Sequence, residues 1–232
     1  MKEKYQKFHY DICDSTSTRA REYINENPDV QYAVFTADGQ SAGRGRQGKS
    51  FYSPKSTGLY MSVIMPAKMK LEDTVSVTAR AAVAVCRALC EMSALPLKIK
   101  WVNDIYLYDK KVCGILCEKT GDRFIIGVGV NLTTEDFPED IKNKAGSLGN
   151  IDKNELSQKI TDGLFCMWQD TDYLDYYREN SCVIGKNITY IENNQEFFAK
   201  AVAIDQNGGL VVENDQKMLK ILQSGEISVR FC

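Results

Sequence analysis

Histidine is nearly absent from the 232-residue sequence, which contains only His9, and no apolar run approaches the roughly 18 residues that span a bilayer. The start, MKEKYQKFHYDIC, also lacks the apolar stretch of a signal peptide. Charges nearly cancel, with 29 Lys and Arg against 31 Asp and Glu, so no global field draws the molecule to nucleic acid or to an anionic membrane. We therefore expect a cytoplasmic protein without a membrane partner, in which any anion site is local.

The eight cysteines do not form the pattern of a zinc site. Such a site favours two-residue spacings and histidine partners, whereas Cys86 and Cys90, like Cys113 and Cys117, are separated by three residues. These four also lie in apolar contexts, as in AAVAVCRALCEM. We expect them to be small buried hydrophobes rather than metal ligands or disulfides.

Composition and pattern predict a larger α+β domain followed by a small β domain. The apolar fraction of 44% and charged fraction of 26% are ordinary for a folded protein. After an N-terminal arm, the first region is expected to contain, in order, a helix over Ser15–Ile24, a strand over Gln31–Asp38, a long loop over Gly39–Ser56, the strand GLYMSVIM and a long buried helix over Leu71–Met92.

The second half of the chain changes character twice. Between Pro96 and Leu132 the runs KIKWV, DIYLY, KVCGILCEK and RFIIGVGVNL predict consecutive antiparallel strands. A helical pattern follows over Asn154–Asn180, with a break near Asp170–Asp172. From Val183 onward, five short runs divided by Asn, Gly and Gln turns predict a small barrel. We place the domains at residues 1–181 and 182–232.

The strongest local signal for chemistry is the run GRGRQGK over Gly43–Lys49. Its glycines allow the backbone close to a ligand, and its cations are uncompensated along the sequence, since no acidic residue occurs between Gly39 and Leu71. The run is neither a Walker loop nor a dinucleotide fingerprint, because a strand rather than a helix follows. An anion is the expected partner, and a solvated basic loop is the alternative.

Two further clusters contain polar residues next to strands. In KWVND, Asp104 is a candidate oxygen ligand for Mg²⁺ brought by a nucleotide, and the nearby Lys111 is a compact charge for phosphate or carboxylate; ordinary turn chemistry by Asn103 and Asp104 is the alternative. In GVGVN, the glycines indicate close approach of another group or tight packing, and Asn131 could contact a base edge or cap a turn.

Taken in order, these segments resemble biotin protein ligases over nearly the whole chain. The resemblance is carried by six motifs: DST at 14–16, QSAGRGRQGKSF at 40–51, KWVNDIYL at 100–107, KVCGILCE at 111–118, GVGVNL at 127–132 and SGEISVR at 224–230. It implies a mixed sheet with helices related to class II aminoacyl-tRNA synthetases, followed by a small SH3-like barrel. It also implies formation of biotinyl-5′-AMP from biotin and ATP with Mg²⁺, and then transfer of biotin to a lysine of a biotin carboxyl carrier domain of acetyl-CoA carboxylase or a related carboxylase.

The same resemblance implies roles for individual residues. Arg44, Arg46 and Lys111 are the expected catalytic cations. The expected biotin-binding residues are these three together with Ser15, Thr16, Ser17, Gln40, Gly43, Gly45 and Gly114. The expected ATP-binding residues are Arg46, Lys49, Phe51, Asn103, Asp104, Asn131 and Arg230, with Asp104 also expected to bind Mg²⁺.

Three positions depart from the family's usual pattern. Val102 replaces a proline, and Lys49 replaces an arginine. Phe51 replaces a tryptophan, and its stacking on adenine is therefore expected to be weaker. About 13 residues precede the DST motif, too few for a three-helix DNA-binding domain, and we expect no DNA binding. Monomer and homodimer both remain open.

Two rival functions remain. A lipoate ligase or octanoyl transferase shares the fold but handles an acyl chain without a ureido head, and the complete GRGRQG loop with KWVND argues against it. A non-catalytic binding module would retain the fold with a vestigial loop. Intact Arg44, Arg46, Asp104 and Lys111 argue against that alternative.

Overall fold

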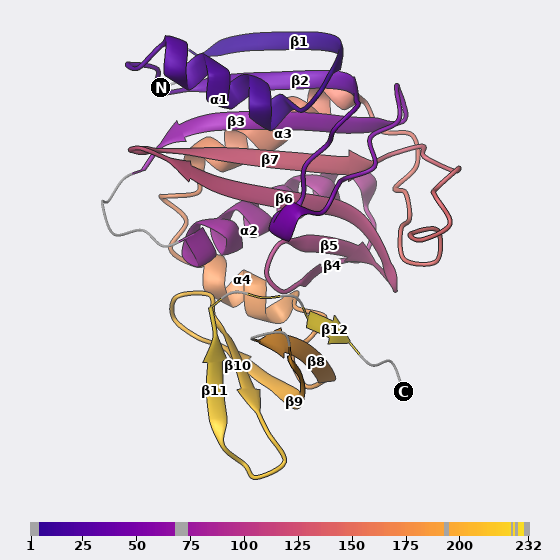
Figure 1. Cartoon of the computed structure of the whole chain (residues 1–232), viewed down its shortest axis with the longest axis vertical. Coiled ribbons are helices and arrows are strands. Elements are labelled where there is room, and N and C mark those ends of the chain that lie inside the picture. The colour runs from indigo at the N-terminus through magenta and orange to yellow at the C-terminus, as the bar shows by residue number, and fades with distance from the viewer. Residues whose placement is uncertain (1–4, 68–73, 193–194, 224, 226, 230–232) are drawn as a thin grey trace.

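A mixed seven-stranded sheet carries the larger part of the chain (Figure 1). The structure, a computed structural model, describes residues 5–67, 74–192, 195–223, 225 and 227–229. The strands, in their order across the sheet, are β1 (Gln6–Cys13), β2 (Ala33–Gln40), β3 (Gly58–Pro66), β7 (Arg123–Asn131), β6 (Lys110–Thr120), β5 (Asp104–Leu107) and β4 (Leu97–Lys100). Only β1 and β2 pair in parallel, whereas the other neighbours are antiparallel.

The sequence analysis assigned no element to the N-terminal arm, but residues 6–13 form β1 at the edge of the sheet. Phe8 and Tyr10 alternate with exposed residues, and the Phe8 ring stacks on Phe35 of β2 at a centroid distance of 4.8 Å. The short alternation is interrupted by charged residues, as expected for a strand with one open edge, and it gives a weak signal in the sequence.

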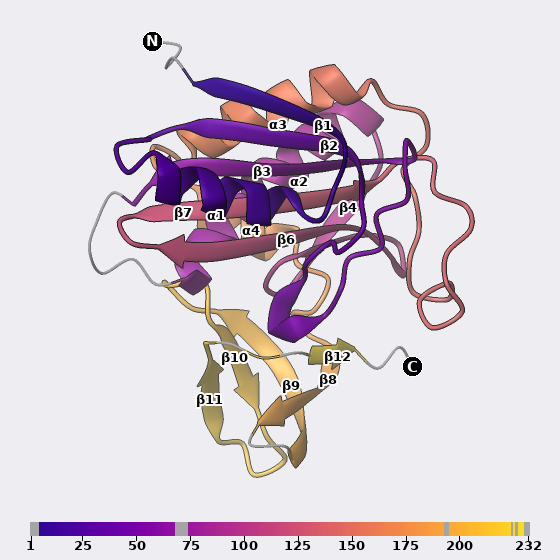
Figure 2. The same ribbon diagram turned by 45° about the horizontal axis from the view of Figure 1, so that its top comes forward.

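Helices cover both faces of this sheet (Figure 2). Helix α1 (Thr16–Glu26) packs on one face, and α2 (Thr74–Ser93) and α3 (Lys153–Cys166) pack on the other. The helix predicted over 71–92 is confirmed from Thr74 onward, and residues 71–73 lie outside the described part of the chain. The predicted interruption near residue 170 is also confirmed, since α4 (Tyr173–Glu179) starts anew after it. None of the described helices is long and apolar enough to cross a membrane.

The antiparallel strands predicted between 96 and 132 are confirmed, with one correction. The strand predicted as KIKWV ends at Lys100, and Trp101 and Val102 lie in a turn with a cis peptide bond between them. The Trp101 side chain is buried, and its indole Nε1 donates to the carbonyl oxygen of Gly208, 2.9 Å away in the C-terminal β domain. Trp101 thus joins the two parts of the chain instead of continuing the sheet.

Five antiparallel strands form the C-terminal β domain, as predicted from the short runs after Val183. Its strands, in sheet order, are β11 (Leu219–Leu222), β10 (Leu210–Glu213), β9 (Gln195–Ile204), β8 (Asn187–Glu192) and β12 (Ile227–Val229). The domain contacts the main body through Trp101 and through Arg178, whose Nε donates to the Ile204 carbonyl at 3.1 Å. The division after residue 181 stays a prediction.

Candidate functional site

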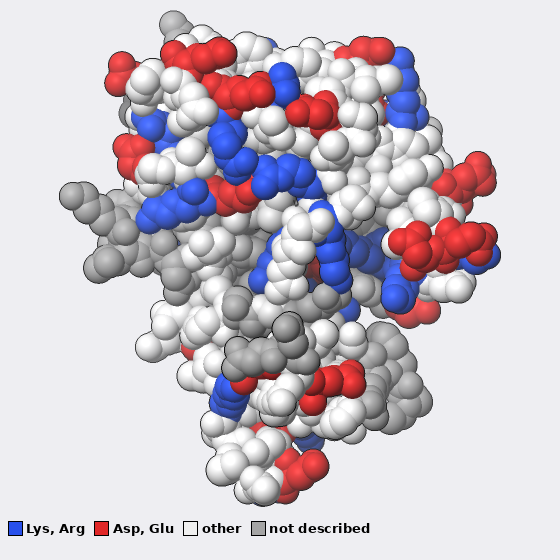
Figure 3. All heavy atoms as spheres, in the orientation of Figure 1, with Lys and Arg blue, Asp and Glu red and all other residues white. Residues whose placement is uncertain are grey.

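A cavity of about 910 Å³ opens between the sheet and the segment 43–51. Among the described residues that line it are six Lys and Arg side chains and three Asp side chains, and in Figure 3 basic side chains gather near the middle of this face. The predicted site residues that it brings together are Ser15, Thr16, Ser17, Gln40, Arg44, Gly45, Arg46, Lys49, Phe51, Asn103, Asp104, Lys111, Gly114 and Asn131. Gly43 lies behind this lining, and Arg230 lies outside the described residues.

The polar end of the cavity is assembled by parallel strand pairing. Cys13 at the end of β1 faces Gln40 at the end of β2, so the first turn of α1, which follows β1, lies next to the Gln40 side chain. Gln40 Oε1 accepts a hydrogen bond from the Thr16 N–H at 2.8 Å, and Gln40 Nε2 donates to Ser53 Oγ at 2.9 Å. These two bonds fix which way the amide of Gln40 points. The sequence reasoning missed Ser53.

Asp14 fixes the start of α1 just before the cavity. Its Oδ1 accepts from the Ser15 N–H at 2.6 Å and from Arg19 Nε at 3.1 Å. Burial raises the pKa of Asp14, but these hydrogen bonds and the Arg19 charge outweigh that effect, so the pKa lies below its usual value. The carboxylate is therefore retained at neutral pH, and Ser15 is held as the N-cap of α1.

Ser62 is a further polar residue that the sequence reasoning missed. It lies in the middle of the apolar strand β3, is fully buried, and places its Oγ 2.8 Å from Thr16 Oγ1 and 3.0 Å from Ser17 Oγ. A lone serine within GLYMSVIM is a faint signal, because an isolated small polar residue is common in strands. In the structure it orients two hydroxyl groups at the wall of the cavity.

We expect Ser62→Ala to destabilise the protein by about 1–2 kcal/mol, because two buried hydroxyls lose a partner. The same change should weaken binding at the polar end of the cavity. Urea unfolding and biotin titration would measure the two effects. The exposed Ser41, replaced by alanine, serves as the control, and equal behaviour of the two variants would contradict the role given to Ser62.

The long loop predicted before the third strand is confirmed between β2 and β3, and within it the basic segment folds into a tight hairpin. Arg44 bridges Ser50, the Gly45 N–H donates to the Lys49 carbonyl at 2.7 Å, and Arg46–Gly48 make one 3-10 turn in which Gln47 has a φ of 54°. Gly43 packs too closely for a side chain, since a Cβ there would lie 2.4 Å from the Phe51 carbonyl oxygen. Gly43 is thus required by the hairpin itself.

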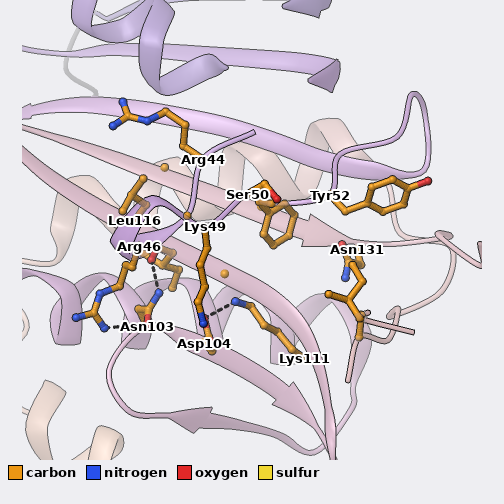
Figure 4. A pocket seen from close by; sticks show the side chains of 18 of the residues that line it. Arg44, Arg46, Lys49, Ser50, Tyr52, Asn103, Asp104, Lys111, Leu116 and Asn131 are labelled. Carbon is orange, nitrogen blue, oxygen red and sulfur yellow. Dashed lines mark hydrogen bonds and ion pairs between the residues drawn. The ribbon is translucent and has the colours of Figure 1, made fainter. Parts of the chain in front are cut away.

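The charge of this hairpin is partly compensated, although its own sequence contains no acid. Glu118 of β6 places Oε1 2.9 Å from Arg44 Nη2. Figure 4 shows the Arg44 side chain directed away from Arg46, Lys49 and Lys111. The partner lies 74 positions along the chain, which is why the local pattern did not reveal it.

Arg46, Asn103, Asp104 and Lys111 form a cluster on the opposite side of the hairpin (Figure 4). Lys111 Nζ lies 2.7 Å from Asp104 Oδ1. The two groups form an ion pair whose geometry is not that of a hydrogen bond. The buried Asp104 Oδ1 accepts no hydrogen bond from the described residues. Arg46 Nη1 donates to Asn103 Oδ1 at 3.3 Å, and Asn103 Nδ2 donates to the Ile115 carbonyl at 2.7 Å. Asn103 thereby holds Arg46 against β6.

The Phe51 ring packs against Gly114 of β6 and Gly129 of β7. A Cβ at Gly129 would be 2.5 Å from the Phe51 ring, and one at Gly114 would be 3.2 Å from both the ring and Lys111 Nζ. The motifs GVGVN and KVCG therefore have a steric basis: glycine leaves room for the aromatic ring and the lysine. The close approach predicted for the GVGVN glycines is found at Gly129, where the approaching group is the Phe51 ring of the same chain.

Asn131 presents an unsatisfied acceptor. Its side chain is buried, Nδ2 donates to the Gly146 carbonyl at 3.0 Å, and Oδ1 has no hydrogen-bond partner among the described residues. Buried amide oxygens without partners are uncommon in folded proteins, and this one belongs to a residue that lines the cavity. The arrangement suits a ligand that donates a hydrogen bond.

Two other parts of the lining were not foreseen as site residues. The loop after β7 contributes Lys144, whose backbone carbonyl accepts from the Lys111 N–H at 2.7 Å. The C-terminal β domain contributes Gly225, Ile227 and Ser228. The composition of neither segment predicts a binding site. The C-terminal segment does, however, belong to the SGEISVR motif of the family resemblance.

The thiols near the cavity are protonated at neutral pH. Burial raises the pKa of Cys117, beneath the hairpin, to about 12, and burial also raises the pKa of Cys182, which lines the cavity. Cys86, Cys113 and Cys117 are buried as predicted, whereas Cys90 is only half-buried. Cys117 and Cys182 are therefore poor nucleophiles, so the cavity offers charge and hydrogen bonds rather than a covalent centre.

Comparison with known proteins agrees with this combination of fold and site. Residues 10–132 match the biotin/lipoate A/B protein ligase family, and residues 183–230 match the biotin protein ligase C-terminal domain. The chain belongs to the biotin/lipoate A/B protein ligase family.

Within that family it has biotin protein ligase activity. It is 32% identical over 236 residues to the bifunctional ligase/repressor BirA of Bacillus subtilis, covering 92% of this chain and 71% of BirA. It is 26% identical to the biotin–[acetyl-CoA-carboxylase] ligase of Mycobacterium tuberculosis, covering 80% of this chain and 74% of that protein. The biotin protein ligase of Aquifex aeolicus, solved in complex with biotin and ATP, superposes with a TM-score of 0.83 at 26% identity, covering 97% and 98% of the two chains.

Proposed function

We propose that the cavity joins biotin to ATP and then passes biotin to a lysine of a carrier domain. In the first step a carboxylate oxygen of biotin attacks the α-phosphorus of ATP, and the bond to pyrophosphate breaks. In the second step the lysine amine attacks the acyl carbon of biotinyl-5′-AMP, loses a proton, and AMP leaves with the electron pair of the broken C–O bond. The observation that carries the proposal is one cavity with an oriented polar end, a cation cluster and an unsatisfied buried amide.

The polar end fits a ureido ring. That group offers one carbonyl acceptor and two N–H donors, and the cavity wall offers hydroxyl groups that can donate or accept together with the fixed amide of Gln40. We assign Ser15, Thr16, Ser17 and Gln40 to the ring. Gly45 and Gly114 are assigned to the same ligand because both line the cavity, and Gly43 supports them by shaping the hairpin.

Cations are the main catalytic groups that we propose, because neither step needs a nucleophilic side chain from the enzyme. Arg46 and Lys111 lie where the biotin carboxylate and the phosphates would meet, and Lys49 adds charge on the same side. Arg44 also lines the cavity, but its guanidinium is paired with Glu118. A direct catalytic role for Arg44 therefore requires that this pair opens.

Mg²⁺ fits the site only as a partner of the nucleotide. The described residues contain no group of three or more His, Cys, Asp or Glu side chains that could hold a metal by themselves. Mg²⁺ commonly takes one or two carboxylates and completes its shell with phosphates and water, and Asp104 supplies one such carboxylate. When bound, the ion would neutralise phosphate charge, while Lys111 holds the Asp104 carboxylate in place.

Phe51 and Asn131 form the proposed nucleotide side. The Phe51 ring presents an aromatic surface, and Asn131 Oδ1 is an acceptor suited to the exocyclic amine of adenine. Guanine carries an oxygen at the equivalent position, so the fixed Asn131 oxygen would repel it. The hydrogen bond from Asn131 Nδ2 to the Gly146 carbonyl fixes the orientation of the amide, and this orientation gives the selectivity for adenine.

Asn131→Ala should raise the KM for ATP roughly tenfold and narrow the preference for ATP over GTP, because one hydrogen bond in a buried setting is lost. Biotin-dependent ATP–pyrophosphate exchange at varied ATP and GTP would measure both constants. The exposed Asn150 provides a matched Asn→Ala control. An unaltered ratio of the two nucleotides would exclude a base-reading role.

The acceptor that we propose is the biotin carboxyl carrier domain of acetyl-CoA carboxylase or a related carboxylase. The support is the similarity to a ligase named for that acceptor, together with a cavity whose walls come from both domains. The first test precedes the acceptor: ATP–pyrophosphate exchange with biotin, lipoate or octanoate. Exchange with biotin alone supports the proposal, whereas exchange with lipoate or octanoate alone assigns a different acid, and no exchange with any acid rejects activation at this site.

A further inference from the structure

Glu118 connects three elements around the basic hairpin. From β6 its Oε1 lies 2.9 Å from Arg44 Nη2 in the hairpin and 2.9 Å from Arg21 Nη2 in α1. The carboxylate side chain is only 20% exposed, and its other oxygen, Oε2, is buried without a hydrogen-bond partner among the described residues. One largely buried carboxylate therefore balances two partly exposed guanidinium groups.

The elements that Glu118 joins are those that build the two ends of the cavity. Helix α1 begins at Thr16, which bonds Gln40 at the polar end. The hairpin carries Arg46, which bonds Asn103 at the cation cluster. Arg44 stands between them, and its backbone bridges Ser50 across the hairpin. Because Glu118 holds Arg44, it fixes the hairpin relative to both ends.

We propose that Glu118 is a positioning residue for the ligase reaction, which holds Arg44 and with it the whole hairpin over the cavity. Arg44 then acts through its ion pair, and Arg46 and Lys111 remain as the cations directed at the ligands. The geometry also explains why a carboxylate is needed. An amide would bring an NH₂ group toward one of the two guanidinium groups and would carry no charge to hold either.

The test compares Glu118→Gln with the unaltered protein in two measurements. The first is the rate of tryptic cleavage after Arg44, Arg46 or Lys49 in the protein without ligands, with the cut sites located by mass spectrometry. We expect cleavage to be roughly three- to tenfold faster, because the partly exposed Arg44–Glu118 ion pair holds the hairpin closed and cleavage follows the open population. The second is the half-life of protein-bound biotinyl-5′-AMP, which should shorten by a similar factor while transfer from added biotinyl-5′-AMP keeps its maximal rate.

Glu22→Gln is the matched control. Glu22 also lies on α1 and pairs with an arginine, Arg19, at 2.8 Å, but it does not touch the hairpin. Glu118→Asp keeps the charge on a shorter side chain and should give an intermediate effect; it replaces Glu118→Gln if that variant does not fold. Unchanged cleavage and retention would overturn the proposal, and so would equal effects in the Glu22 variant. The cleavage measurement does not depend on the proposed function. If the unaltered protein retained no biotinyl-5′-AMP, the proposed function would fail while the cleavage result still tested the Arg44–Glu118 contact. Faster cleavage without loss of retention would reject the positioning role of Glu118 in the reaction.

Discussion

Replacing Lys111 by alanine should slow the formation of biotinyl-5′-AMP by about 100- to 1000-fold, the range seen when one preorganised charge-stabilising group is removed. Lys111 is proposed to face the place where the carboxylate of biotin meets the phosphates, and its removal also leaves the Asp104 carboxylate without its 2.7 Å partner, facing incoming anions. Transfer from preformed biotinyl-5′-AMP should slow much less. The two half-reactions are measured separately, by pyrophosphate exchange and by transfer of added adenylate to a carrier domain.

The adjacent Lys110 supplies the control, because it carries the same charge but donates to the Asn143 carbonyl away from the cavity. A double variant, Lys111→Ala with Asp104→Ala, separates two causes. Recovery in the double variant would show that the unpaired carboxylate caused the loss, whereas no recovery would assign it to the missing cation. Equal slowing of both half-reactions in the single variant would contradict the role proposed for Lys111.

The second large effect is expected for Arg46→Ala, which should release biotinyl-5′-AMP about 30-fold faster. Arg46 is half-buried beside Asn103, so we take the lower end, about 2 kcal/mol, of the loss expected when a desolvated charge pair is broken. The intermediate carries a phosphate charge that Arg46 would face. Rapid filtration of the preformed complex measures its lifetime.

Lys55→Ala is the control for Arg46→Ala. Lys55 belongs to the same acid-free stretch, but it is exposed and lies 2.6 Å from Asp11 on β1. If both variants release the intermediate at the same rate, general charge rather than the position of Arg46 would explain retention. An unchanged lifetime in Arg46→Ala alone would remove Arg46 from the proposed site.

Local patterns predicted most of the fold, and they failed where the structure depends on distant partners. The long helix α2 and the meander β4–β7 have strong periodicity and clear turns, and both formed as expected. β1 was missed because Phe8 and Tyr10 give a weak alternation whose meaning depends on α1 and β2. The strand predicted as KIKWV was too long, because Trp101 is apolar and resembles a strand residue. In the structure the Trp101 side chain contacts the C-terminal β domain instead.

In the candidate site, too, local motifs were predictive and contacts between distant residues were not. Residues within recognisable motifs, such as Gln40, Arg46 and Asn131, are predicted by those motifs to share one site, and all three line the cavity. Ser62 lies outside every motif, and Glu118 was given no role although it ends KVCGILCE, since each acts on a partner more than 40 positions away. Charge balance around the hairpin is a property of the fold, because the acid and the bases that it pairs lie in distant parts of the sequence.

The parallel pairing of Cys13 with Gln40 also determines where this enzyme can tolerate changes of chain length. The hydroxyl groups of α1 meet the amide of Gln40 only while β1 keeps its alignment with β2. One inserted residue in β1 would exchange its inner and outer faces and move the start of α1 by about 3.3 Å. The loop over residues 215–218, between β10 and β11, is exposed and lines no part of the cavity. A library of insertions should therefore be depleted of active members in β1 and retain them in that loop, which makes the loop the natural place to attach a tag or a second domain.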